Sequence, residues 1–179
     1  MNRRKFLSYT FGTGAVLTTS LLALSLQGTN IVDPPQPLQC FSLKEFSVLF
    51  AVANILIPHN PPFPSAAECH IASKVDLVLS TAHLQQQEQF KLVLALIENP
   101  SISTILNMQI HPFSQSTEVE KRARLEQWRI GFTQLRSAFK ALNGICNAAY
   151  YAQPSVEKLV GYGGPPESIL EIRRAKGYP

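Results

Sequence analysis

Cysteine and histidine are residue types that bind metal ions in closely spaced motifs, and cysteine can also carry redox chemistry. No pair of cysteines in this chain has the CxxC spacing of zinc sites and thioredoxin-like centres. Cys69 and His70 are adjacent, and neighbouring residues do not share a helix face. The histidines are scattered, at His59, His70, His83 and His111. We therefore expect no metal site in this chain.

The number of cysteines limits their pairing. The three are Cys40, Cys69 and Cys146. Because the count is odd, at least one is free or pairs with another chain. We expect at most one bridge within the chain.

Motifs that assemble catalytic or nucleotide sites do not occur in the sequence. It contains no GxGxxG, GxxxxGK[ST], GxSxG or HExxH. A Ser–His–Asp or Cys–His set assembled in space stays open, although no spacing favours one. We assign no catalytic, cofactor-binding or metal-binding residue, and the sequence favours a subunit or binding module over an enzyme.

An export signal is predicted at the start of the sequence. Arg3 and Arg4 precede Phe6 and Leu7, and a weakly apolar stretch follows over residues 11–26. This pattern is typical of a twin-arginine signal, which is read by the twin-arginine translocase and directs a folded protein to the periplasm. A plain secretory signal and an uncleaved membrane anchor are the competing interpretations. Cleavage is weakly marked, with the nearest small-x-small site at residues 23–25.

Charge argues against a nucleic-acid partner. The whole chain has 16 basic and 12 acidic residues, but three of the basic ones, Arg3, Arg4 and Lys5, belong to the leader. The remainder has 13 basic and 12 acidic residues. A net charge of +1 lacks the basic surface that binds nucleic acid.

The rest of the sequence predicts an all-α fold, a small irregular helical bundle with proline-rich loops. Apolar residues recur at helical spacing, and no strand-like alternation is present. We divide the chain into a signal peptide (1–26), a linker (27–40) and a helical domain (41–179). The expected elements are a buried central helix capped by Ser42 and stopped by Pro58, a helix capped by Ser65 and ending near Ser80, a helix from Gln85 to Ile97, a short helix from Ile102 to Met108, a helix opened by Thr117, a helix continuing to Ala149 that Gly131 separates or bends, and a last turn reaching Leu159.

Spacing along these helices predicts which residues face the core. On the second helix they are Ile71, Val75, Val78 and Leu79. On the helix opened by Thr117 they are Leu125, Trp128 and Phe132.

Two segments combine large apolar side chains with backbone that suits a loop better than a helical core. One is the proline-rich loop at residues 58–64, and the other is the tail at residues 150–166. Proline loops lose little entropy on binding, and tyrosine offers a large apolar face with a polar tip. The predicted partner-binding residues are Phe63, Pro64, Tyr151, Tyr162, Gly163 and Pro165. The alternative is a C-terminal segment that folds back and caps the bundle.

Several of these features together resemble the gluconate 2-dehydrogenase subunit 3 family. They are the Arg3-Arg4 leader, the helix end Ile55-Leu56-Ile57-Pro58, the step Ser65-Ala66-Ala67-Glu68, the pair Arg124-Leu125 followed by Trp128, and the tail that runs from Tyr150-Tyr151 through Pro154-Ser155-Val156 to Gly161-Tyr162-Gly163-Gly164-Pro165-Pro166. The tail carries the best match.

The resemblance implies an all-α, non-catalytic small subunit. Its expected partner is a large FAD-containing subunit of the glucose-methanol-choline type, which lacks a leader and is exported bound to the small subunit. A cytochrome c subunit often receives the electrons. The resemblance implies no cofactor in this chain, and a periplasmic location with membrane association through the complex. A stand-alone periplasmic helical binding protein remains the alternative function.

The leader yields a first prediction. Replacing both Arg3 and Arg4 with Lys should leave the chain in the cytoplasm, because the translocase reads the arginine pair rather than positive charge alone. Cell fractionation and immunoblotting measure this, with the parent chain as control. Normal delivery of the double variant to the periplasm would contradict twin-arginine dependence.

Overall fold

The computed structural model describes residues 28–99, 111–164, 169 and 175, and within these residues the fold is helical with no strand. The elements in chain order are α2 (Leu43–Leu56), α3 (Ile71–Ser80), α4 (Leu84–Glu98), the 3₁₀ turn η1 (Phe113–Gln115), α6 (Glu118–Ile130), α7 (Thr133–Tyr151) and α8 (Pro154–Leu159). The predicted all-α class is therefore confirmed. The leader, the short helix expected at Ile102–Met108 and Pro165 lie outside the described residues.

Helix α2 is the centre of the bundle, as its sequence predicts. It begins at a capping box, in which the Ser42 side chain accepts from the Glu45 amide and the Glu45 carboxylate accepts from the Ser42 amide. Its apolar side chains point in almost every direction, and most of them are buried. Helices α3, α4, α6 and α7 and the turn η1 all contact it.

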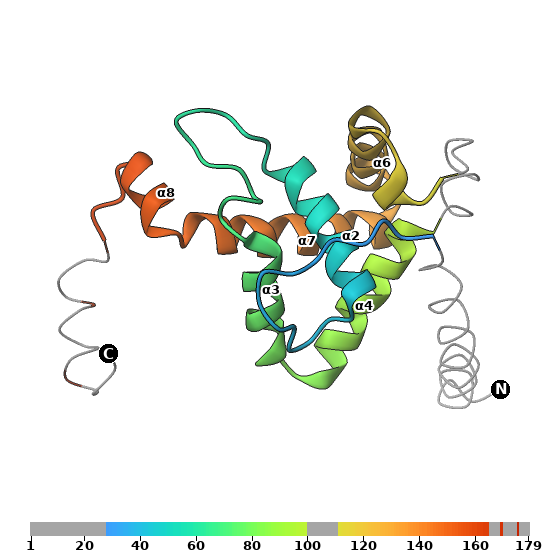
Figure 1. Cartoon of the computed structure of the whole chain (residues 1–179), viewed down its shortest axis with the longest axis horizontal. Coiled ribbons are helices and arrows are strands. Elements are labelled where there is room, and N and C mark those ends of the chain that lie inside the picture. Colours follow the sequence, from blue (N-terminus) through green and yellow to red (C-terminus); the bar gives the residue numbers. More distant parts are fainter. Residues whose placement is uncertain (1–27, 100–110, 165–168, 170–174, 176–179) are drawn as a thin grey trace.

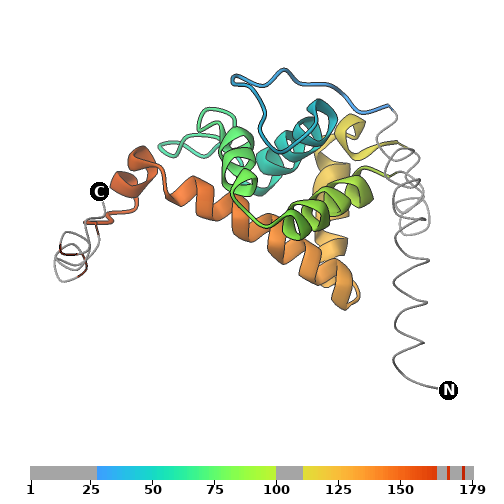
Figure 2. The ribbon, with the colours of Figure 1, turned by 90° about the horizontal axis from the view of Figure 1, so that it is seen from below.

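Helix α7 runs along one side of the molecule, and the shorter helices stack on it (Figure 2). Its buried residues are Leu135, Leu142, Cys146 and Tyr150, which recur at helical spacing on one face. The helix has 19 residues, which corresponds to a length of about 28 Å. Its contacts with α3 and α6 join the two ends of the bundle.

The second helix begins later than the sequence predicts. Ser65 and Glu68 do form the expected reciprocal hydrogen bonds. However, the turn that they cap ends at His70, which is left-handed with a φ of 51°. The amides of His70 and Ile71 donate to the carbonyls of Ala67 and Ala66, the Schellman pattern of a helix end. The predicted start was therefore wrong, because the capping box opens a separate single turn.

Two predicted core residues are exposed. Val78 is 55% exposed, because the buried face of α3 includes Ala72 and Asp76 and is rotated away from Val78. Phe132 is 60% exposed, because α6 ends at Ile130 and Phe132 is already the N-cap of α7. Both core predictions were wrong.

Gly131 separates α6 from α7 rather than bending one long helix. A Cβ atom at this position would lie 2.8 Å from the carbonyl oxygen of Gln127. Only glycine therefore allows the backbone to turn back so closely on the end of α6.

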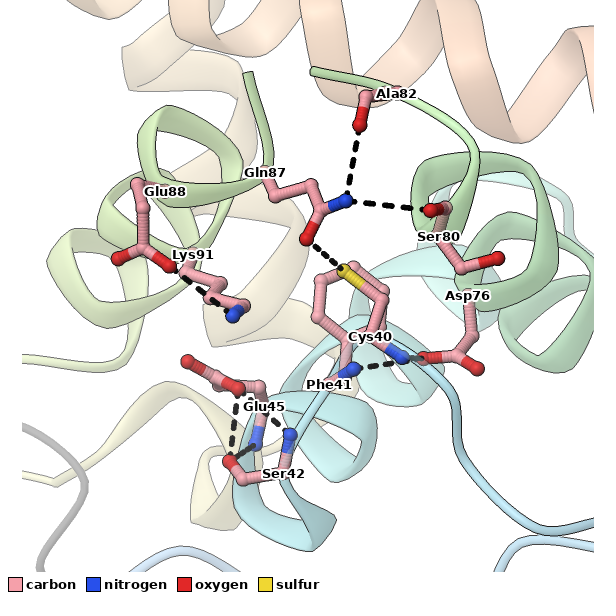
Figure 3. A network of polar contacts seen from close by, with 10 residues as sticks. All are labelled: Cys40, Phe41, Ser42, Glu45, Asp76, Ser80, Ala82, Gln87, Glu88 and Lys91. Carbon is pink, nitrogen blue, oxygen red and sulfur yellow. Dashed lines mark hydrogen bonds and ion pairs between the residues drawn. The ribbon is translucent and has the colours of Figure 1, made fainter. Parts of the chain in front are cut away.

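The segment before α2 is held against the bundle by a buried carboxylate. Asp76 on α3 accepts hydrogen bonds from the amides of Gln39, Cys40 and Phe41 at 2.7, 3.0 and 2.8 Å. Figure 3 shows this carboxylate beside the Ser42 capping box at the start of α2. Nearby, the Gln87 side chain on α4 donates to the carbonyl oxygens of Ser80, the last residue of α3, and of Ala82. The starts of α2 and α4 and the end of α3 therefore meet in one polar network.

Replacing Asp76 with Ala should destabilise the bundle by about 3 kcal/mol, because three amides lose their charged acceptor. Urea denaturation followed by circular dichroism measures the change. Asp33→Ala is the matched control, since Asp33 is an exposed aspartate in the same N-terminal segment. Equal denaturation midpoints for the two variants would show that the carboxylate does not anchor the segment.

Candidate partner-binding surface

The proline-rich loop after α2 is tied to the end of α7. The Phe63 amide donates to the carbonyl of Asn60, which closes the loop on itself. The Tyr150 hydroxyl then donates to the carbonyl oxygen of Pro64 at 2.8 Å. Phe63 is only half-buried and packs against the edge of the core. The loop is therefore held in one place while part of its apolar surface faces solvent.

The tail presents two exposed tyrosines. Tyr151 is 52% exposed, and its ring packs edge-on against Tyr150 with centroids 5.4 Å apart. Pro154 opens α8, and Gly161 ends it with a φ of 72°. The amides of Gly161 and Tyr162 donate to the carbonyls of Lys158 and Glu157, so a second Schellman motif fixes the chain beyond α8. Tyr162, which follows this turn, is 53% exposed.

The proline loop and α8 lie side by side at one end of the molecule in both ribbon views (Figures 1 and 2). The structure thus brings together the two segments that contain Phe63, Pro64, Tyr151, Tyr162 and Gly163. Gly163 is exposed. Their role in binding a partner stays a prediction. We call these five residues the Pro/Tyr surface.

The most deeply buried charges lie away from this surface. Glu98, at the end of α4, accepts from both the amide and the hydroxyl of Ser114, at 2.9 and 2.6 Å. Arg124 on α6 donates to the carbonyl oxygens of Ile97 and His111, at 3.1 and 3.0 Å. Both side chains are fully enclosed. This network was not predicted from the sequence, because nothing in the local spacing marks either residue as buried.

Burial determines the proton affinity of this pair. It raises the pKa of the Glu98 carboxyl, although the hydrogen bonds from Ser114 and the charge of Arg124 act in the opposite direction. It lowers the pKa of the Arg124 guanidinium. The guanidinium also lies over the Phe113 ring, 5.7 Å from its centroid. These contacts join α4, η1 and α6, and they indicate a structural role.

The cysteines are unbridged, and burial makes their thiols poor nucleophiles. It raises the pKa of Cys146 to about 12, and it also raises the pKa of Cys40 and Cys69. Over the described part of the chain, no three His, Cys, Asp or Glu side chains gather as a metal site would require. Within that same part, none of the helices has the length and apolar character needed to cross a membrane.

An uncharged groove of about 750 Å³ lies between α4 and the first half of α7. Leu79 and Phe90 are its most buried lining residues, and Val93 and Ala141 belong to opposite helices. Its polar lining residues are Gln86, Gln89, Thr133, Gln134 and Ser137. Among the residues that the structure describes, no titratable side chain lines it. The groove therefore suits apolar contact rather than acid–base chemistry.

Comparison with known proteins gives one match. The family model described as "Gluconate 2-dehydrogenase subunit 3" matches residues 44–164. No curated protein and no solved structure matches the chain. The matched range runs from the first turn of α2 to the residues after α8, so it includes the proline loop, the groove and most of the tail.

The Glu98 network yields a pH prediction. A carboxyl whose pKa is raised on folding binds its proton more tightly in the folded state. Its contribution to stability is therefore complete below the unfolded-state pKa of about 4.3, and it is lost as the pH rises through the folded-state pKa. The parent should thus gain stability relative to Glu98→Gln as the pH falls from 7 to 4. Urea denaturation at several pH values measures this difference. A difference that stays constant, or that shrinks on acidification, would contradict the assignment.

Proposed function

Because the chain belongs to the gluconate 2-dehydrogenase subunit 3 family, we propose that it is the non-catalytic small subunit of a periplasmic, membrane-associated dehydrogenase. The large subunit would carry FAD and oxidise a sugar or an alcohol. The small subunit would support the folding of that flavoprotein and its export by the twin-arginine translocase. The family match over residues 44–164 is the observation that carries this proposal.

The arrangement of polar groups supports a non-catalytic role. The buried carboxylates of Asp76 and Glu98 accept hydrogen bonds from backbone amides and from Ser114, so they already have structural partners. The thiols are disfavoured as nucleophiles by burial. FAD and the reacting groups are therefore assigned to the partner, and a cytochrome c subunit would accept the electrons.

The Pro/Tyr surface supports the partner role. Hydrogen bonds fix both of its segments before any partner binds, so little further entropy is lost when a partner binds. Stable subunit contacts bury about 800 Å² on each side, and exposed tyrosines are well suited to such contacts. Tyr151 and Tyr162 would supply the protruding part of this contact.

The segment after the leader supports export as a folded unit. The Asn30 amide donates to the Ser114 hydroxyl, and the Val32 amide donates to the Ser47 hydroxyl, each at 2.9 Å. These two serines come from η1 and α2. The chain next to the leader is thus secured only when distant parts of the bundle have assembled, which fits a pathway that carries folded proteins.

Co-purification tests both the function and the surface. The full chain, expressed in its native cells, should retain a flavoprotein with the absorption spectrum of FAD. Tyr162→Ala and Phe63→Ala should weaken this retention at least tenfold while lowering the melting temperature of the free subunit by only a few degrees, since the side chains are partly exposed.

Val119→Ala is the control, because Val119 is an exposed apolar residue on α6, outside the Pro/Tyr surface. Absence of any flavoprotein from the parent preparation would overturn the proposed function. Normal retention by folded Tyr162 and Phe63 variants would instead place the interface elsewhere.

A further inference from the structure

We propose that the groove between α4 and α7 binds an uncharged amphipathic helix of the flavoprotein subunit. This inference rests on the proposed function and adds a second contact, separate from the Pro/Tyr surface. Helix α4 lies over the first half of α7 (Figure 2), and described residues from α3, α4 and α7 line the space between them.

The size of the groove fits a helix. A helix about 10 Å across occupies roughly 420 Å³ for each turn of 5.4 Å. The volume of about 750 Å³ would therefore hold roughly two full turns, or three to four turns that are half sunk between the walls. An amphipathic helix laid into an apolar groove is a common mode of recognition between proteins.

The shape of the walls favours the same occupant. The α7 wall carries small side chains, Ser137, Ala138 and Ala141, which allow a third helix to approach closely. The α4 wall carries the larger Leu92 and Val93. Large side chains facing small ones leave room for the ridge of an inserted helix.

The described residues that line the groove carry no charge, and this decides the chemistry of the occupant. A charged side chain pushed into this groove would lose water without meeting an opposite charge. The polar side chains of the described lining are glutamine, serine and threonine, which pair with uncharged polar groups. The inserted face should therefore be apolar, with uncharged polar residues along its edges.

The position of the groove makes it a separate contact. Its α7 residues are Thr133, Gln134, Ser137, Ala138 and Ala141, all in the first half of that helix. Tyr151 ends the helix, about 15 Å beyond Ala141. One large partner could cover both the groove and the Pro/Tyr surface. A substitution in either region leaves the other region unaltered.

Ala141→Glu tests the groove. Ala141 is exposed in the free subunit, so the variant should fold normally, but the complex would have to enclose an unpaired carboxylate. We expect a dissociation constant at least tenfold higher for the flavoprotein that co-purifies with the full chain. Ala141→Trp, which fills the groove without charge, should weaken binding as well. Ala123→Glu is the matched control, because Ala123 is an exposed alanine on α6 that does not line the groove, and it should bind like the parent.

A photocrosslinking amino acid at position 141 identifies the occupant. The expected crosslink is to an uncharged helical face of the flavoprotein. Crosslinks only to a second copy of the chain, or only to residues 1–26 of the chain itself, would overturn the inference. Tight binding by both Ala141 variants would overturn it while leaving the proposed function intact. A parent chain that retains no flavoprotein would overturn both.

Discussion

The burial of α2 on nearly all sides is the constraint on which the rest of the fold depends. A helix with apolar residues around its circumference is stable in water only when other elements cover it completely. Here α3, α4, α6, α7 and η1 share that task. The segment before α2 completes the cover, with Phe41 buried and Val32 and Leu38 packed against the core. The proline-rich and irregular connections follow from the need to place so many short elements around one helix.

Buried polar groups hold this cover in place. Asp76 holds the approach to α2, and Glu98 with Ser114 holds η1 beneath α4. Each carboxylate accepts from backbone amides, so its burial is compensated by hydrogen bonds that no apolar residue could supply. Arg124 performs the complementary task by donating to carbonyl oxygens at the end of α4 and before η1. The charges inside the domain therefore specify how its segments meet.

Local signals in the sequence were sufficient for much of this fold. The capping boxes at Ser42 and Thr117 need only four residues each, and both were predicted correctly. The errors arose where distant residues decide. The left-handed His70 ends one turn and starts α3 independently of the Ser65 box. The exposure of Val78 depends on how α3 is rotated against α2 and α7.

Of the candidate surface, the loop and tail segments could be predicted from composition. The Tyr150–Pro64 hydrogen bond could not be predicted, because it joins residues that are 86 positions apart. The groove could not be predicted for the same reason, because α4 and α7 line it without being neighbours in the sequence.

The division of roles along α7 connects the fold with a subunit function. Its buried face packs on the rest of the bundle, including α3 and α6, so the helix is fixed along its length. Its first half forms one wall of the uncharged groove, and its end holds the proline loop through Tyr150. A rigid helix of this length keeps the groove and the Pro/Tyr surface at a constant separation, so a partner that fitted both would meet a surface that needs no rearrangement. For the accessory role proposed above, such fixed geometry would give the subunit its selectivity for a partner.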